Sequence, residues 1–175
     1  MRLTDIDPDV ILAHLRDPRI AQHLPLLPAN PDAALVKQMI ETKEECWERD
    51  RLGHWAILHD GEYVGWGGFQ RELDEWDFGL VLRPEFFQQG KAIALQAFEW
   101  ARRHTGIEEV TFLLPLSRSK RALLRLGARP LGISEHADIP FRKWRLKLGA
   151  VGKRGVGTKD HIGKGTGTRH RRGCT

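Results

Sequence analysis

Apolar residues recur along the chain with two different periods, and these periods predict its secondary structure. Short apolar runs between turn residues predict strands at 54–59, 62–69, 78–82, 110–114, 129–133 and 141–148, and Arg2–Thr4 is a candidate for a short first strand. Apolar residues three or four apart predict helices that begin near residues 8, 31, 90 and 117. The predicted order is β-α-α-β-β-β-α-β-α-β-β, which indicates an α/β fold of the α+β type.

Proline and aspartate mark the boundaries of the first two helices. Asp7-Pro8 provides an N-cap and a first helical residue, and Asn30-Pro31 repeats this start signal. Asp17-Pro18 ends the first helix, and the apolar, proline-containing segment Arg19–Ala29 is predicted to pack as a loop. The second helix is predicted to end near Arg49.

The next two predicted strands form a hairpin. Asp60-Gly61 lies between them, and this dipeptide is a strong signal for a two-residue turn. Three glycines in the second strand, Gly65, Gly67 and Gly68, indicate a bulge or a close approach of another backbone segment. The polar segment Arg71–Glu75 is predicted to be a turn that leads to the next strand.

The stretch Trp76–Ala101 has the order strand, glycine-containing loop, helix. Pro84 ends the strand, the loop covers Glu85–Gln89, and the helix begins at Gly90. Gly106 is a plausible residue just beyond the C-terminus of this helix. A helix N-terminus with free backbone N–H groups attracts anions, so this loop is a candidate phosphate site.

Length and composition are consistent with one globular domain. The chain has 175 residues, of which 41% are hydrophobic and 29% are charged. Neither a membrane-spanning run nor an N-terminal signal peptide is visible, and Cys46 and Cys174 suggest no disulfide framework. The histidines have no metal-ligand spacing. We therefore expect a cytoplasmic protein that needs no metal.

The last residues differ in composition from the rest of the chain. Residues 149–175 hold seven of the 28 Lys and Arg residues, only one of the 23 acidic residues, and eight of the 18 glycines. The basic balance of the chain, +5 overall, therefore belongs to this tail. Because large apolar residues are nearly absent there, we predict a folded domain at 1–148 and a disordered tail at 149–175.

The stretch VLRPEFFQQGKAIALQAFEWA, residues 81–101, resembles motif A of the GCN5-related N-acetyltransferases. The resemblance is nearest to the branch of the ribosomal-protein N-terminal acetyltransferases and covers roughly residues 1–147. The family signature, Gln/Arg-x-x-Gly-x-Gly/Ala, falls on Phe87–Ala92, with Phe87 at its first position and Gln88 where glycine is common. Farther along, SRSKRALLRLGA resembles a later family helix, with Ser119 at its serine position and Leu116 where the family has asparagine.

This resemblance implies a fold, a cofactor and its binding residues. It implies a mixed, mostly antiparallel sheet flanked by helices, and acetyl-CoA as the acetyl donor. Backbone groups of the splayed strand would bind the pantetheine arm, and the signature would bind the pyrophosphate. The implied cofactor-binding residues are Leu80, Val81, Leu82, Phe87, Gln88, Gln89, Gly90, Lys91, Ala92 and Ser119.

The resemblance leaves the acid and base of the reaction open. The family often places a carboxylate near the start of the central strand, where this chain has Asp77 and Glu75. Apolar flanking residues would raise the pKa of Asp77 by desolvation. The alternative is that Asp77 is an edge carboxylate paired with an arginine. The family's usual tyrosine acid has no counterpart, since Tyr63 is in the hairpin, so Ser119 or water would replace it.

The leading hypothesis is an acetyl-CoA-dependent N-acetyltransferase, in which a primary amine attacks the thioester directly. The acceptor would be a protein N-terminus, a lysine or a small amine, and the protein would be a monomer or a homodimer. One alternative is a CoA-binding or regulatory module without catalysis. Another is weak nucleic-acid binding through the basic tail, although the tail has no aromatic residue for base stacking.

Overall fold

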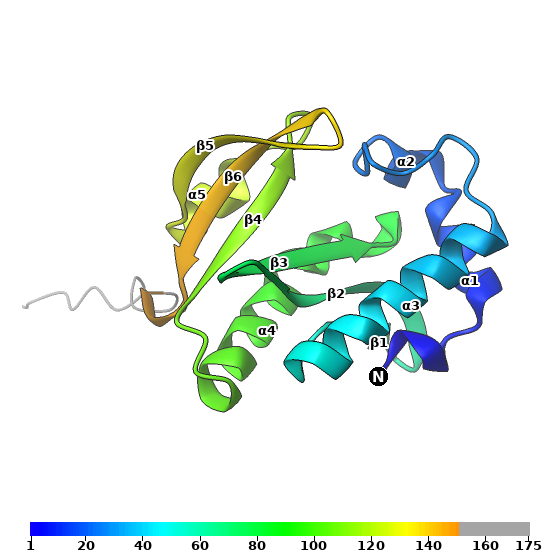
Figure 1. Cartoon of the computed structure of the whole chain (residues 1–175), viewed down its shortest axis with the longest axis horizontal. Helices are drawn as coiled ribbons and strands as arrows, with labels where there is room; N and C mark the ends of the chain where they lie inside the picture. Colours follow the sequence, from blue (N-terminus) through cyan, green and yellow to red (C-terminus); the bar gives the residue numbers. More distant parts are fainter. Residues whose placement is uncertain (151–175) are drawn as a thin grey trace, which may run out of the picture.

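A single six-stranded sheet runs through the computed structural model, which describes residues 1–150 (Figure 1). The strand order is β1-β2-β3-β4-β6-β5, and every neighbouring pair is antiparallel except β3 and β4. The mixed, mostly antiparallel sheet predicted from the sequence is confirmed. The strands are β1 (His54–His59), β2 (Glu62–Glu72), β3 (Glu75–Leu82), β4 (Glu109–Pro115), β5 (Arg129–His136) and β6 (Ile139–Lys147).

Helices cover both faces of this sheet. Two long helices, α3 and α4, lie on opposite faces (Figure 1). The helices are α1 (Pro8–Leu15), α2 (Pro18–Ala21), α3 (Ala33–Asp50), α4 (Gly90–His104) and α5 (Arg121–Leu126), with short 3-10 helices η1 (Leu3–Asp5), η2 (Pro84–Gln89) and η3 (Leu148–Ala150). None of them, over residues 1–150, combines the length and apolar character that a membrane span needs.

Aromatic side chains form the core between the sheet and α4. Phe78 of β3 contacts Phe98 of α4 at 4.7 Å between ring centroids, and Phe69 and Phe112 of the neighbouring strands pack around them. All four are at most 8% exposed. Such edge-on aromatic contacts add about 0.5–1.5 kcal/mol per pair to the free energy of burial. This core fixes β3 and α4, and therefore the segment between them.

A second core lies on the other face, where α1 and α3 cover β1 and β2. Leu3, Ile11 and Val36 are fully buried there. The backbone of β2 also approaches β3 closely at Gly65, where a Cβ atom would lie 2.2 Å from the carbonyl oxygen of Val81. The close approach predicted from the glycines of this strand is therefore confirmed.

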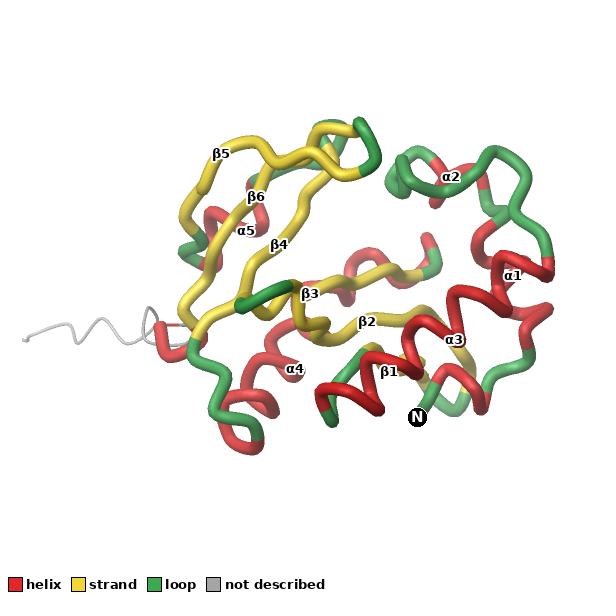
Figure 2. The backbone as a smooth tube through the Cα atoms, in the orientation of Figure 1, coloured by secondary structure: helices red, strands yellow, loops and turns green. Residues whose placement is uncertain are grey.

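The sheet opens between β3 and β4. These two parallel strands pair only at Asp77 and Thr111. From that point β3 and the half-sheet of β4, β6 and β5 run in different directions, which Figure 2 shows as a V. The open end of this V lies at the C-terminal ends of both strands.

Several predicted boundaries are wrong. Arg2–Thr4 is not a strand, because Leu3–Asp5 forms the 3-10 helix η1, and the side chain of Asp5 accepts a hydrogen bond from the backbone N–H of Arg2. The predicted loop Arg19–Ala29 begins with α2, which Asp17 caps. The predicted loop Glu85–Gln89 is the 3-10 helix η2.

Other boundaries are confirmed or shifted by a few residues. Asp60 and Gly61 have φ of 51° and 84°, as the predicted hairpin turn requires. The helix predicted after Asn30-Pro31 is capped by Asp32, whose side chain accepts from Leu35 N at 2.9 Å. β2 and β3 extend into the predicted polar turn, and α5 begins later than expected, at Arg121. The predicted disordered tail lies almost wholly outside the described residues.

Candidate active site

Asp77 and Thr111 lie at the vertex of the V. The hydroxyl of Thr111 donates to Oδ1 of Asp77 at 3.2 Å, and it lies 3.4 Å from the carbonyl oxygen of Trp76. Side chains alternate along a strand, so Asp77 projects to the face opposite its buried neighbour Phe78. This is the face that α3 covers.

Burial is the main influence on the Asp77 carboxyl. Its pKa is raised from 3.8 to about 6, chiefly because burial penalises the charged form. The hydrogen bond from Thr111 and the charges of Lys143 and Lys43 act in the opposite direction, and Glu72 adds to the increase. Asp77 makes no ion pair within residues 1–150, so the predicted alternative of an arginine partner is wrong. A carboxylate of this kind is ionised at neutral pH and is a better base than an exposed one.

A polar network lies beside Asp77 on the same face. Gln70 is the cross-strand partner of Asp77, and its Oε1 accepts from Nζ of Lys43 at 2.5 Å. The amide of Gln70 also donates to Glu72. Burial lowers the pKa of Lys43, which comes from α3, and the nearby carboxylates Glu72 and Asp77 partly offset this. The vertex therefore has a cation and a carboxylate close to Asp77, and both influence its ionisation.

His54 of β1 pairs with Gly68 of β2, which is two residues before Gln70. A Cβ atom on Gly79 would lie 3.3 Å from Cε1 of His54 and 3.5 Å from Nε2, so the imidazole covers the glycine. Burial, together with the charge of Lys43, lowers the pKa of His54 to about 3. The ring is therefore neutral at physiological pH, and its buried Nδ1 has no hydrogen-bond partner among the described residues.

Glu75 has a different environment from Asp77. Its carboxylate receives hydrogen bonds from Lys143 and Arg145 of β6, and these bonds, led by that from Lys143, lower its pKa. The arginine pair expected for Asp77 is thus found at Glu75. A carboxylate held by two cations is a weak base.

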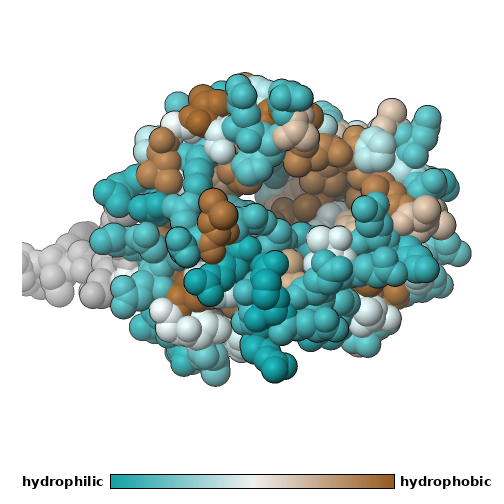
Figure 3. All heavy atoms as spheres, in the orientation of Figure 1, coloured by the Kyte–Doolittle hydropathy of each residue, from teal (hydrophilic) through white to brown (hydrophobic). Residues whose placement is uncertain are grey.

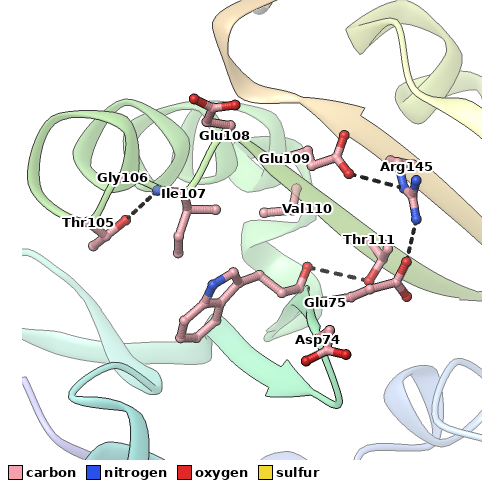
Figure 4. Close-up of a pocket in the computed structure, with 11 residues that line it drawn as sticks. Asp74, Glu75, Thr105, Gly106, Ile107, Glu108, Glu109, Val110, Thr111 and Arg145 are labelled. Carbon is pink, nitrogen blue, oxygen red and sulfur yellow. Dashed lines mark hydrogen bonds and ion pairs between the residues drawn. The ribbon is translucent and has the colours of Figure 1, made fainter.

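A cavity of about 370 Å³ lies beyond the vertex, on the side away from the open end of the V (Figure 4). Thr111 and Trp76 line it, together with the connection between α4 and β4. Its charged lining residues are Asp74, Glu75, Glu108, Glu109 and Arg145. Four acidic residues against one base make this cavity attractive to cations.

The predicted phosphate segment lies at the other end of β3. Gly90, Lys91 and Ala92 form the first turn of α4, as predicted, but the preceding residues Phe87, Gln88 and Gln89 belong to η2. The backbone N–H of Gly90 donates to the carbonyl of Phe87, so it is not free. The 15-residue α4 has no side-chain N-cap, so no capping side chain offsets the positive end of its dipole.

The remaining predicted site residues lie along the two arms of the V. Leu80, Val81 and Leu82 are the last residues of β3. Ser119 lies beyond the end of β4, where it is exposed and its Oγ accepts from Arg121 N at 3.4 Å. Ser119 is eight positions beyond Thr111 along the chain, and no hydrogen bond joins it to Asp77 within residues 1–150. Between the arms, the surface is hollowed and lined with apolar side chains near α2 and the β5–β6 hairpin (Figure 3).

Comparison with known families agrees with this geometry. A family model described as an acetyltransferase (GNAT) domain matches residues 1–129. The chain belongs to this family of acetyltransferases. No curated protein matches the chain.

Solved structures share the GNAT fold at low identity. A putative GnaT-family acetyltransferase from Bordetella pertussis is 16% identical, with a TM-score of 0.65 over 83% of this chain and 91% of that one. The aminoglycoside acetyltransferase AAC(6')-Ib in complex with coenzyme A is 14% identical, with a TM-score of 0.67 over 86% and 93%. Spermidine N-acetyltransferase from Vibrio cholerae, in complex with CoA and spermine, is 8% identical, with a TM-score of 0.66 over 86% and 94%.

In this GNAT domain, four polar residues around Asp77 were not predicted from the sequence. Thr111 is the one polar residue of an apolar strand, which is a usable signal. Lys43 lies in a charged stretch of α3, and nothing in the pattern separates it from its exposed neighbours. Gln70 and His54 lie at strand ends, and only the register of β1, β2 and β3 brings them to the same face. No group of three potential metal ligands occurs among residues 1–150.

Proposed function

We propose that this GNAT-family protein transfers an acetyl group from acetyl-CoA to a primary amine. The observation that carries the proposal is the V between β3 and β4, with the half-buried carboxylate of Asp77 at its vertex and the N-terminus of α4 at the end of one arm. An acyl-CoA with its phosphates at α4 and its pantetheine arm between the strands would place the thioester in the V. Pantetheine amides would pair with unpaired backbone groups of Leu80, Val81 and Leu82.

In the proposed reaction, the acceptor enters as an ammonium ion and loses a proton to Asp77 through bridging water. The free amine attacks the thioester carbonyl, so that a C–N bond forms. A backbone N–H near Val81 stabilises the oxyanion. The C–S bond then breaks as the nitrogen gives up its second proton to solvent, and the CoA thiolate takes up one proton from solvent. The family's tyrosine acid has no counterpart, and no hydrogen bond joins Ser119 to the vertex within residues 1–150, so we assign this proton to solvent.

The acceptor is a cationic amine: a protein N-terminus, a lysine or a small polyamine-like molecule. The acidic cavity next to Thr111 supports this class, because a positively charged acceptor would be attracted to the vertex. Two structural neighbours are described as acting on aminoglycosides and on spermidine. The motif resemblance to the ribosomal-protein N-terminal acetyltransferases favours the first acceptor type, and only an acceptor screen separates the three.

Calorimetric titration with acetyl-CoA is the primary test. In the structure, Gly90 has helical φ and ψ, and a Cβ there would meet only side-chain atoms of Leu82 and Leu80, at 3.5 Å and 3.9 Å. Gly90→Asn and Gly90→Asp are therefore both compatible with the fold, and they differ by one charge. We expect Gly90→Asp to bind acetyl-CoA at least tenfold more weakly than Gly90→Asn, because its carboxylate repels the phosphates.

This titration, together with a screen for acetylation of amines, separates the enzyme from a non-catalytic CoA-binding module. If the wild type binds acetyl-CoA and acetylates no amine in a screen of N-terminal peptides, lysine peptides, aminoglycosides and polyamines, the module hypothesis replaces ours. If the wild type, correctly folded, binds no acetyl-CoA, both are wrong.

A further inference from the structure

The open end of the V is spanned by the segment around α2. On the β3 side, Nη2 of Arg19 forms an ion pair with Glu85 of η2 at 2.7 Å. On the β4 side, the carbonyl of Gln22 accepts a hydrogen bond from Ser117 at 3.3 Å. The segment 17–23 therefore contacts both arms, and Figure 1 shows α2 above the opening.

Arg118 lies under this segment, with its guanidinium over an aromatic ring of the opposite arm. Its Cζ is 5.6 Å from the ring centroid of Phe87, within the range of a cation–π contact. His23, from the segment after α2, packs on the same ring with centroids 6.1 Å apart. Residues far apart in sequence thus meet at Phe87, the first residue of the predicted phosphate signature.

The guanidinium of Arg118 has no counter-charge among residues 1–150. Within residues 1–150 no carboxylate or carbonyl accepts a hydrogen bond from it, whereas Arg19 and Arg145 are both held by acids. Arg118 is nevertheless half-buried, and burial lowers its pKa. A partly desolvated cation without a partner is unfavourable. An anion that binds it forms a charge-assisted contact, and the protein has already lost part of the water around the guanidinium, so little further desolvation opposes binding.

The surroundings of Arg118 favour an anion over other ligands. The N-terminus of α4 begins three residues after Phe87, and its dipole adds positive potential to that of the guanidinium. His23 is kept neutral, because burial and then the charge of Arg118 lower its pKa. Phe87, whose ring lies against the guanidinium, is 38% exposed. A phosphate oxygen pair matches the planar fork of an arginine.

We propose that Arg118 binds a phosphate group of the CoA donor, from the arm of the V opposite the α4 N-terminus. This assignment rests on the proposed function, and it adds a residue that the motif itself does not contain. The bound cofactor would then be held by both arms, with its phosphates between a helix N-terminus and a guanidinium. Because Arg118 and His23 share the ring of Phe87, the same contact links the cofactor to the α2 segment.

The competing explanation is that Arg118 only stabilises the fold by packing on Phe87. The full chain separates the two explanations in calorimetric titrations with CoA, 3′-dephospho-CoA and pantetheine, which has no phosphate. Arg118→Gln removes the charge and keeps much of the side-chain bulk. Arg125→Gln, at an exposed arginine of α5, is the matched control.

We expect Arg118→Gln to weaken CoA binding by roughly ten- to a hundredfold, the value of a charge-assisted contact to phosphate, and Arg125→Gln to leave it unchanged. The loss should shrink at high salt and be absent for pantetheine. A loss confined to CoA assigns the 3′-phosphate, and an equal loss with 3′-dephospho-CoA assigns the pyrophosphate.

Two outcomes would overturn the assignment while leaving the proposed function intact. One is unchanged CoA binding by Arg118→Gln when the wild type binds. The other is an equal weakening of CoA and pantetheine together with a lower unfolding temperature, which would mean that Arg118 acts through the fold. Absence of CoA binding by the wild type would overturn the proposed function, and this assignment with it.

Discussion

Replacing the carboxylate at the vertex should make the protein more stable, and the gain should depend on pH. In Asp77→Asn the amide oxygen can still accept the hydrogen bond from Thr111, while the charge is removed. Folding raises the pKa of Asp77 from 3.8 to about 6, so the folded protein binds this proton more tightly than the unfolded chain. Ionised Asp77 therefore destabilises the fold, and the destabilisation grows as the pH rises from about 4 to about 6.

The magnitude follows from the two pKa values. Each tenfold change in proton affinity is worth about 1.4 kcal/mol, so the ionised carboxylate costs on the order of 3 kcal/mol at pH 8, and little of that below pH 4. We expect Asp77→Asn to be more stable than the wild type at pH 8 by up to this amount, and to show a much smaller difference near pH 4.5. The same variant should lose acetyl transfer, because an amide accepts no proton.

Urea unfolding at the two pH values measures this difference. Glu62→Gln, at an exposed carboxylate of β2, is the control and should show a small effect at both. If Asp77→Asn has the same stability relative to wild type at pH 4.5 and pH 8, or is less stable at pH 8, the reasoning about burial at the vertex is refuted. Such a gain in stability with a loss of activity is the trade-off expected where a fold maintains a strained functional group.

Two further predictions concern the surroundings of the vertex. Gly79→Ala places a Cβ 3.3 Å from His54, so we expect a stability loss of about 1 kcal/mol and slower turnover with little change in acetyl-CoA affinity. In urea unfolding, adding His54→Ala should recover part of this loss. Additive stability losses for the two substitutions would contradict the contact. Glu75→Gln weakens its ion pairs with Lys143 and Arg145, so thermal unfolding should show a loss of about 1 kcal/mol at neutral pH. Because these cations lower the pKa of Glu75, that loss should disappear as the pH falls through the lowered value, and turnover should remain; inactivity of a folded variant would instead favour Glu75 as the base.

Local sequence signals predicted most of the sheet and the main helices. The Asp60-Gly61 turn, the apolar run of β4 and the start of α4 at Gly90 each depend on a few neighbouring residues, and the structure agrees with all three. The prediction failed where a short polar contact decides the outcome. Arg2–Thr4 was predicted as a short strand, but the backbone N–H of Arg2 bonds to the side chain of Asp5, and Leu3–Asp5 forms the 3-10 helix η1.

The candidate site was less predictable, because it depends on register. Asp77 could be named from its apolar neighbours, but its partner Thr111 lies 34 residues away, and no local pattern joins the two. Glu75 and Asp77 are two residues apart and look equivalent in sequence. Burial raises the pKa of Asp77, whereas hydrogen bonds from Lys143 and Arg145 on β6 lower that of Glu75.

The single pairing of Asp77 with Thr111 gives this sheet two strand edges inside the molecule. Unpaired N–H and C=O groups along a strand edge are templates for pairing with another chain, and they promote aggregation when they are exposed. β3 and β4 each carry such an edge beyond the vertex. The α2 segment, tied to both arms through Arg19 and Gln22, lies over the place where a foreign strand would enter. The α2 segment, which borders the proposed cofactor site, therefore also covers these strand edges against strand addition in the unliganded protein.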